Sequence, residues 1–290
     1  MKRFVGLMLS LSVVLAMVGT GIAVAQEKSR AMPPPKILVI GREYTKPGKA
    51  GAAHEKTESA FVQAMKKAKW PTHYLAVESL SGKSRALFLT GYDSFAEWEK
   101  DAQAGEKNAA FTADIARAWA GDGEMLSDTD GGIFQFNEDY SLRPNVDIAH
   151  CRYFEIGRFV LKPGHDGDWA EIMKLVKGAY EKIAPQHWAM YTEIYGATNS
   201  TYVYFTALKT GEEMDQGLAE GKEFEAALGA DGLKKLGELS AAAIEESQTH
   251  LFAFSPKMSY PRDEWVKADP DFWAPKAAAA PAAKKKADGQ

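Results

Sequence analysis

A motif that occurs twice constrains this chain more than any other feature. The sequence GREYTKPG begins at Gly41, and GRFVLKPG begins at Gly157, which is 116 positions later. Both copies follow an apolar run, precede a pattern of helical period, and share Gly-Arg and Lys-Pro-Gly at identical spacing. The match predicts an internal duplication, so we expect the chain to fold as two similar halves.

Hydrophobic periodicity predicts the same order of elements in each half. In the first half we expect strands at 37–40, 74–80, 85–90 and 132–136, and helices at 54–69, from 94, and at 109–119. In the second half we expect strands at 153–161, 188–195, 201–205 and 250–254, and helices at 169–183, 212–218 and 224–246. The order βαββαβ is that of a ferredoxin-like unit, so the predicted fold class is α+β with two tandem repeats.

The chain begins with features of a secretory signal peptide. Lys2 and Arg3 precede an apolar stretch, and Ala23-Val24-Ala25 supplies the small residues of a cleavage site, so we expect a cut near Ala25 and a periplasmic or secreted protein. No later segment is apolar enough to suggest a membrane span. The predicted divisions are a signal peptide at 1–25, a Pro-rich lead at 26–35, repeat 1 at 36–136, a linker at 137–150, repeat 2 at 151–256, an aromatic C-terminal extension at 257–275, and a disordered Ala/Pro/Lys tail at 276–290.

Composition excludes several kinds of function. The net charge of −4 becomes more negative once Lys2 and Arg3 are removed, and such a surface repels nucleic acid. The lone cysteine, Cys151, cannot form an internal disulfide, and no Cys-x-x-Cys-His motif is present for covalent haem attachment. We therefore expect the hydrophobic core to stabilise the protein, with no cofactor or metal. We expect a monomer or a homodimer.

The duplicated βαββαβ order resembles the dimeric α+β barrel superfamily, which includes NIPSNAP-like proteins, antibiotic-biosynthesis monooxygenases and the chlorite dismutase group. The resemblance covers about residues 36–256 and rests on element order and duplication, with NIPSNAP-like proteins the nearest match. It implies that the antiparallel sheets of the two repeats pack together as an α+β barrel within one chain. It implies fold much more than function.

Alternation along the first strand of each repeat separates two faces. The mostly apolar face, which holds Leu38, Ile40 and Arg42 in repeat 1, is predicted to face the helices. The mixed face is predicted to line the barrel, and it holds Glu43 in repeat 1 and Glu155 and Phe159 at matching places in repeat 2. Arg42 and Arg158 could bind a carboxylate, but a mostly apolar face favours structural ion pairs or backbone hydrogen bonds at a strand end. Glu155 is expected in the cavity.

A polar and aromatic surface in repeat 2 is the predicted ligand site; the alternative is that its tyrosines pack and hydrogen-bond one another or reach solvent. Its residues alternate along one strand and along the hairpin partner of that strand. A cavity with convergent polar groups is the usual place for a ligand. The motif Pro-x-His-aromatic recurs at 71–74 and 185–188, which adds two histidines that act either as turn caps or as functional groups. The candidate ligand-binding residues are His187, Tyr191, Glu193, Tyr195, Tyr202, Tyr204, Glu155 and His73.

Three functions remain open from the sequence. The first is an exported protein that binds a small hydrophobic or aromatic ligand in a pocket on the second repeat. The second, which the resemblance allows, is a cofactor-independent monooxygenase or isomerase of an aromatic or polyketide-like substrate. The third is haem binding, which ranks last because the helix expected at 169–183 contains no histidine.

Overall fold

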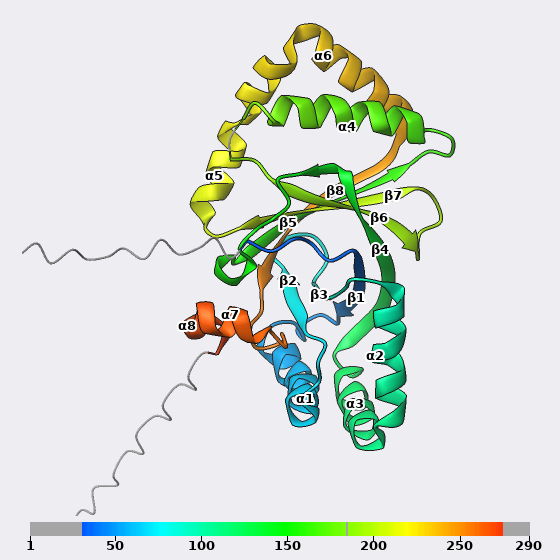
Figure 1. Ribbon diagram of the computed structural model, residues 1–290, viewed down its shortest axis with the longest axis vertical. Coiled ribbons are helices and arrows are strands. Elements are labelled where there is room, and N and C mark those ends of the chain that lie inside the picture. The colour runs from blue at the N-terminus through cyan, green and yellow to red at the C-terminus, as the bar shows by residue number, and fades with distance from the viewer. Residues whose placement is uncertain (1–30, 184, 275–290) are drawn as a thin grey trace, which may run out of the picture. The chain divides into compact units, whose positions relative to one another are not determined.

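Two similar passes of the chain supply the strands and helices of the fold (Figure 1). The computed structural model describes residues 31–183 and 185–274. The first pass contains β1 (Ile37–Thr45), α1 (Ala52–Ala68), β2 (Tyr74–Ser79), β3 (Arg85–Tyr92), α2 (Phe95–Lys107), α3 (Ala109–Asp122) and β4 (Leu126–Leu142). After a short 3-10 helix, η1 (Ile148–His150), the second pass contains β5 (Tyr153–Leu161), α4 (Asp166–Tyr180), β6 (Trp188–Tyr195), β7 (Thr201–Leu208), α5 (Gly211–Ala219), α6 (Gly221–Ala243) and β8 (Ile244–Phe254). Two short helices, α7 (Asp263–Ala268) and α8 (Pro270–Trp273), follow.

The described strands form one closed antiparallel barrel of eight. Their order around the barrel is β1-β3-β2-β8-β5-β7-β6-β4, and β4 pairs with β1 to close it. The ladders β2–β8 and β4–β6 join the two passes, so each pass supplies half of the wall. The expected α+β class and the closed α+β barrel are therefore present.

Local sequence explains where the elements begin and end. Lys46-Pro47-Gly48 ends β1, and the positive φ of 76° at Gly48 is a turn conformation that glycine adopts at low cost. The predicted capping box begins α2, because Ser94 accepts from the amide of Glu97 and Glu97 accepts from the amide of Asp93.

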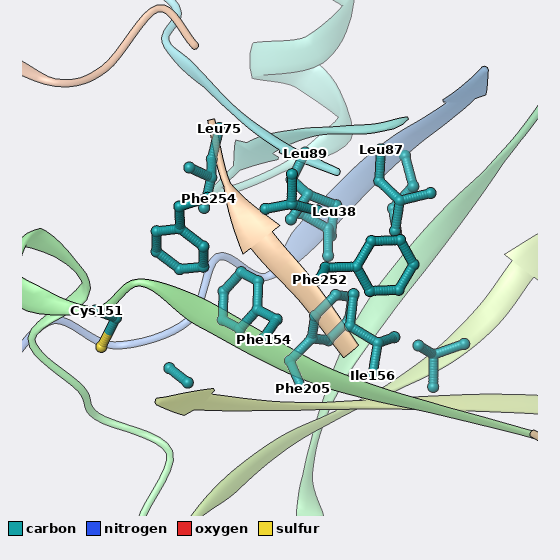
Figure 2. Packing of buried hydrophobic residues seen from close by; sticks show 14 of the residues in the cluster. Leu38, Leu75, Leu87, Leu89, Cys151, Phe154, Ile156, Phe205, Phe252 and Phe254 are labelled. Atoms are coloured by element: carbon teal, nitrogen blue, oxygen red, sulfur yellow. The ribbon is translucent and has the colours of Figure 1, made fainter. Parts of the chain in front are cut away.

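Apolar side chains from every strand fill the barrel lumen. Leu38, Leu75, Phe154 and Phe252, from four different strands, converge in Figure 2. The predicted assignment of faces was therefore wrong: the face with Leu38 and Ile40 lines the lumen. The opposite face, with Glu43, lies under the helices. Glu43 and Glu155 are accommodated there because each finds a hydrogen-bonding partner, His54 and Tyr204 respectively.

The helices cover the outer surface of the barrel. In Figure 1, α4 and α6 lie over strands of the second pass, and α1 and α3 lie together next to strands of the first pass. Within the described residues, no helix combines the length and the apolar character needed to cross a membrane.

Some elements differ from the expected bounds. β4 continues to Leu142, inside the segment 137–150 that we predicted as a linker, and β8 begins at Ile244 where a helix was expected to continue. The aromatic extension packs on the body as expected, since the Trp273 indole donates to the carbonyl of Ala149 at 2.8 Å and the ring is buried. The predicted signal peptide and the tail at 276–290 lie outside the described residues.

Candidate functional site: the barrel lumen

Three of the predicted site residues come together at one end of the lumen. His73, His187 and Tyr191 line an apolar cavity of about 150 Å³, which the Pro-rich segment 33–35 also lines. Backbone carbonyls accept hydrogen bonds from His187 and Tyr191, while the buried Nδ1 of His73 has no partner among the described residues. His187 donates from Nε2 to the carbonyl of Ala207 at 2.9 Å, and the Tyr191 hydroxyl donates to the carbonyl of Pro35 at 3.1 Å. This end of the lumen therefore offers mainly apolar surface.

Three other predicted residues lie on the outer face of the barrel. Tyr204 donates to Glu155 at 2.8 Å, and both line a depression next to α4. Tyr202 stacks on Trp169 of α4 with ring centroids 5.0 Å apart. Because successive residues of a strand point to opposite faces, the structure separates this group from His187 and Tyr191.

Glu193 and Tyr195 lie near the other end of β6. The Tyr195 side chain projects outward, and the residue is 62% exposed. Glu193 is buried, with Oε1 3.7 Å from Arg42 and no hydrogen-bonding partner for Oε2 among the described residues. Burial raises the pKa of Glu193, while Arg42 and then Arg158 act to lower it.

A second and larger cavity occupies the opposite end of the lumen. It has a volume of about 590 Å³ and takes its lining from the later part of β1, the start of β3, and the central parts of β5 and β8. We call it the cationic cavity, because three arginines line it: Arg42, Arg85 and Arg158. Its apolar wall consists of Ile40, Leu87, Phe134, Ile156, Val203, Phe205 and Phe252.

The three arginines differ in their partners. Arg42 forms an ion pair with Asp130, and Arg158 lies 3.2 Å from Glu246, as expected for structural ion pairs. Arg85 has no ion pair with any described carboxylate. Its guanidinium lies 5.1 Å from the centroid of the Phe252 ring and donates to the carbonyl of Lys83 at 3.3 Å. Burial lowers the pKa of Arg85, while the charge of Asp130, which lines the same cavity and pairs with Arg42, acts to raise it.

His250 supplies a neutral polar group to the same cavity. Burial, followed by the charge of Arg85, lowers the pKa of His250. Its Nε2 lies 3.2 Å from Gln248, and its buried Nδ1 has no partner among the described residues. Sequence reasoning placed neither His250 nor Arg85 in a site. The sequence signal that could have located this cavity is the spacing of 116 positions between Arg42 and Arg158, which predicts equivalent places for these two arginines in the two halves.

Comparisons with known proteins assign no family to this chain. No protein-family profile matches the chain, and no curated protein matches it. A solved structure named as a monooxygenase, from Fusobacterium nucleatum, is similar at 13% identity over 77% of this chain and 94% of that one, with a TM-score of 0.49. An anthrone oxidase-like protein is similar at 8% identity over 76% and 91% of the two chains, with a TM-score of 0.47.

A variant of chlorite dismutase from Candidatus Nitrospira defluvii is also similar. The identity is 9% over 82% of this chain and 97% of that one, with a TM-score of 0.45. Likenesses at this level assign no activity, ligand or haem to the present chain.

Proposed function

We propose that this protein binds a small organic anion with an apolar body in the cationic cavity. The observation that carries the proposal is Arg85, a partly desolvated guanidinium that lines the cavity and has no carboxylate partner among the described residues. A buried cation without a counter-ion is costly, and an anionic ligand removes that cost. Arginine also presents several donors in a fixed geometry that matches a carboxylate.

The rest of the cavity favours an amphipathic ligand. Phe134, Ile156 and Phe252 supply apolar wall, and the volume of about 590 Å³ suits a small organic molecule. Lys83 adds a further positive charge at the lining. A ligand whose carboxylate binds Arg85 and whose hydrocarbon or aromatic part packs on the apolar wall would match both the charged and the apolar residues of the cavity.

Calorimetric titration with octanoate and octylamine tests the proposal, because the two probes share an apolar chain and differ in charge. We expect octanoate to bind with a stoichiometry of one, more weakly as salt rises, and octylamine to bind far less. Arg85→Gln is expected to weaken octanoate binding at least about 10-fold, since a hydrogen bond to a charged group contributes about 1.5–3 kcal/mol. Arg117→Gln is the matched control, because Arg117 is exposed and pairs with Asp114 on α3.

Two results would overturn this function. Equal binding of octylamine would show that charge is not recognised. Unchanged octanoate affinity in a folded Arg85→Gln variant would place the ligand elsewhere, and Arg85→Lys, which keeps the charge, separates loss of charge from loss of packing on Phe252.

We infer that the cavity arose by duplication of one βαββαβ unit. Arg42 and Arg158 stand 116 positions apart, as the two motif copies do, and both line the cationic cavity, which supports the inference. NIPSNAP-like ancestry for this unit stays a prediction from the resemblance.

We also propose that binding takes place outside the cytoplasm, on the strength of the leader at 1–25. Intact mass of the protein from fractions of its own host is expected to show a chain that begins at Gln26. An uncut chain in the cytoplasmic fraction would contradict export. Cofactor-independent oxidation or isomerisation stays an alternative prediction, and so does haem binding, for which a Soret band on haem titration is the test.

A further inference from the structure

A buried cluster of ionisable side chains lies outside the lumen, between the barrel and its first-pass helices. Glu43 comes from β1, His54 and Glu58 come from α1, and Asp122 is the last residue of α3. Their exposed fractions are 5%, 1%, 2% and 0% respectively. Acidic residues are rarely buried to this extent without a positive partner, so the cluster needs an explanation.

The four side chains converge on a small volume. Nε2 of His54 lies 3.1 Å from Glu43 Oε2, 3.4 Å from Asp122 Oδ1 and 3.9 Å from Glu58 Oε1. One donor atom from each residue lies within 4.8 Å of all the others. Donors on a tetrahedron with metal–ligand distances of about 2.0–2.1 Å are about 3.3 Å apart, and the observed distances fall around this value.

Two carboxylate oxygens in the cluster lack a hydrogen-bonding partner among the described residues. Glu58 Oε1 and Asp122 Oδ2 are buried and accept no hydrogen bond from the described residues. Unsatisfied buried acceptors are uncommon, and for charged groups the free-energy cost is high. Three carboxylates face a single imidazole, so the four side chains supply more acceptors than donors. A bound cation would satisfy both observations.

We propose that Glu43, His54, Glu58 and Asp122 bind one divalent transition-metal ion. An imidazole nitrogen with three carboxylate oxygens is a donor set that suits Zn²⁺ or Mn²⁺, and Zn²⁺ is expected to bind more tightly. Four protein ligands in a closed, buried site are typical of a structural metal. The ion would tie β1 to α1 and to the end of α3.

A neighbouring hydroxyl holds one ligand in position. Thr57 donates from Oγ1 to Asp122 Oδ1 at 2.5 Å, which fixes the orientation of that carboxylate. Groups that orient metal ligands in this way raise the affinity of metal sites. Thr57 lies in α1 between the two ligands of that helix, so one helix supplies two ligands and the group that orients a third.

Calorimetric titration of the untagged, EDTA-treated full chain with ZnCl₂ tests the proposal. We expect one Zn²⁺ per chain and weaker binding as pH falls, since the ligands must lose protons. Glu58→Gln is expected to weaken binding at least 10-fold. Glu55→Gln is the matched control on the same helix, because the Glu55 carboxylate pairs with Lys257 at 2.6 Å and does not belong to the cluster.

A second measurement keeps the proposal open to refutation if Glu58→Gln does not fold. Pulsed electron paramagnetic resonance of wild-type protein with MnCl₂ is expected to show coupling to one imidazole nitrogen, which is lost in His54→Gln. Absence of Zn²⁺ and Mn²⁺ binding by wild-type protein would overturn the proposal. Equal Zn²⁺ affinity in folded Glu58→Gln and Glu55→Gln variants would also overturn it, because the ion would then bind elsewhere.

Discussion

The two passes of the chain bury opposite chemistry at the same place under their helices. Glu43 of β1 and Phe159 of β5 stand at equivalent positions, 116 residues apart. Around Glu43 the buried groups are His54, Glu58 and Asp122. Around Phe159 they are aromatic: Trp169 lies 5.0 Å from Phe159 and 5.0 Å from Tyr202, measured between ring centroids.

The difference shows that one backbone arrangement accepts two kinds of interior. The aromatic cluster is stable on its own, because large rings bury apolar area and gain further from ring contacts. The charged cluster requires protons or a metal ion, because buried carboxylates without a partner are costly. The interior of the first pass therefore depends on bound protons or a metal ion, and the aromatic interior of the second pass does not.

Trp169→Ala is expected to have the largest effect. Trp169 is 1% exposed and contacts both Phe159 and Tyr202, so its removal leaves a cavity in the second-pass cluster. We expect a loss of about 3–5 kcal/mol in the free energy of unfolding, measured by urea denaturation. Trp119→Ala is the control, since Trp119 of α3 is 48% exposed and should cost far less. Equal losses would contradict the packing described for the second pass.

Metal removal is expected to have the next largest effect and to act on the first pass alone. At 100-fold excess over Kd, a ligand that binds only the folded state adds about 2.7 kcal/mol. For a chain of this size that corresponds to a fall in Tm of about 5–10 °C when EDTA is added to the Zn²⁺-loaded protein. Glu58→Gln, which is expected to bind the ion at least 10-fold more weakly, should respond less to EDTA. A similar response in this variant would place the stabilising ion outside the cluster.

Thr57→Val tests the buried charged cluster of the first pass without removing any of the four proposed metal ligands. Loss of the hydroxyl that orients Asp122 is expected to weaken Zn²⁺ binding about 10-fold, with little change in the stability of the metal-free protein. Ser59→Ala on the same helix is the control, because Ser59 donates only to the carbonyl of Lys56 on the exposed side. Titration of both variants in parallel measures the difference. If Ser59→Ala weakens binding as much, the effect comes from the helix and not from Asp122.

Alkaline pH is expected to produce the smallest effect, which a substitution at Tyr202 isolates in the second pass. Burial, followed by the charge of Asp166, raises the pKa of Tyr202 to about 12 from an ordinary value of 10. The unfolded chain loses this proton first, so the stabilising contribution is complete below pH 10 and falls as pH rises towards 12. Tyr202→Phe should therefore lose less stability between pH 9 and 11 than wild-type protein, by urea denaturation. An identical slope would show that Tyr202 ionises freely in the folded state.

Several features of the fold were predictable from local pattern. The repeated Lys-Pro-Gly signal located the exits of β1 and β5, and Ser94 with Glu97 located the start of α2. Alternation also identified correctly which residues of β1 share a face. It did not show which face would be enclosed, so Glu43 was assigned to the lumen and Arg42 to the helices.

The candidate sites depended on contacts that cross the sequence. Arg85 shows no repeat partner in the sequence and was not predicted as a site residue, yet the closed barrel places it with Arg42 and Arg158 around one cavity. His54 and Glu58 are one helical turn apart, but Glu43 and Asp122 reach them only because β1 and α3 pack against α1. The spacing of residues along the sequence does not predict that these four side chains meet.

The sequence by itself determined the order of strands and helices, because turn residues and hydrophobic period act over a few neighbouring positions. Tertiary structure decided which face of each strand became interior, because closure of the barrel and coverage by helices are properties of the whole chain. It also decided the chemistry of the two helix-covered interiors. The tertiary structure separated the aromatic residues that were predicted to form one site. It also brought four ionisable residues together where the sequence predicted no site.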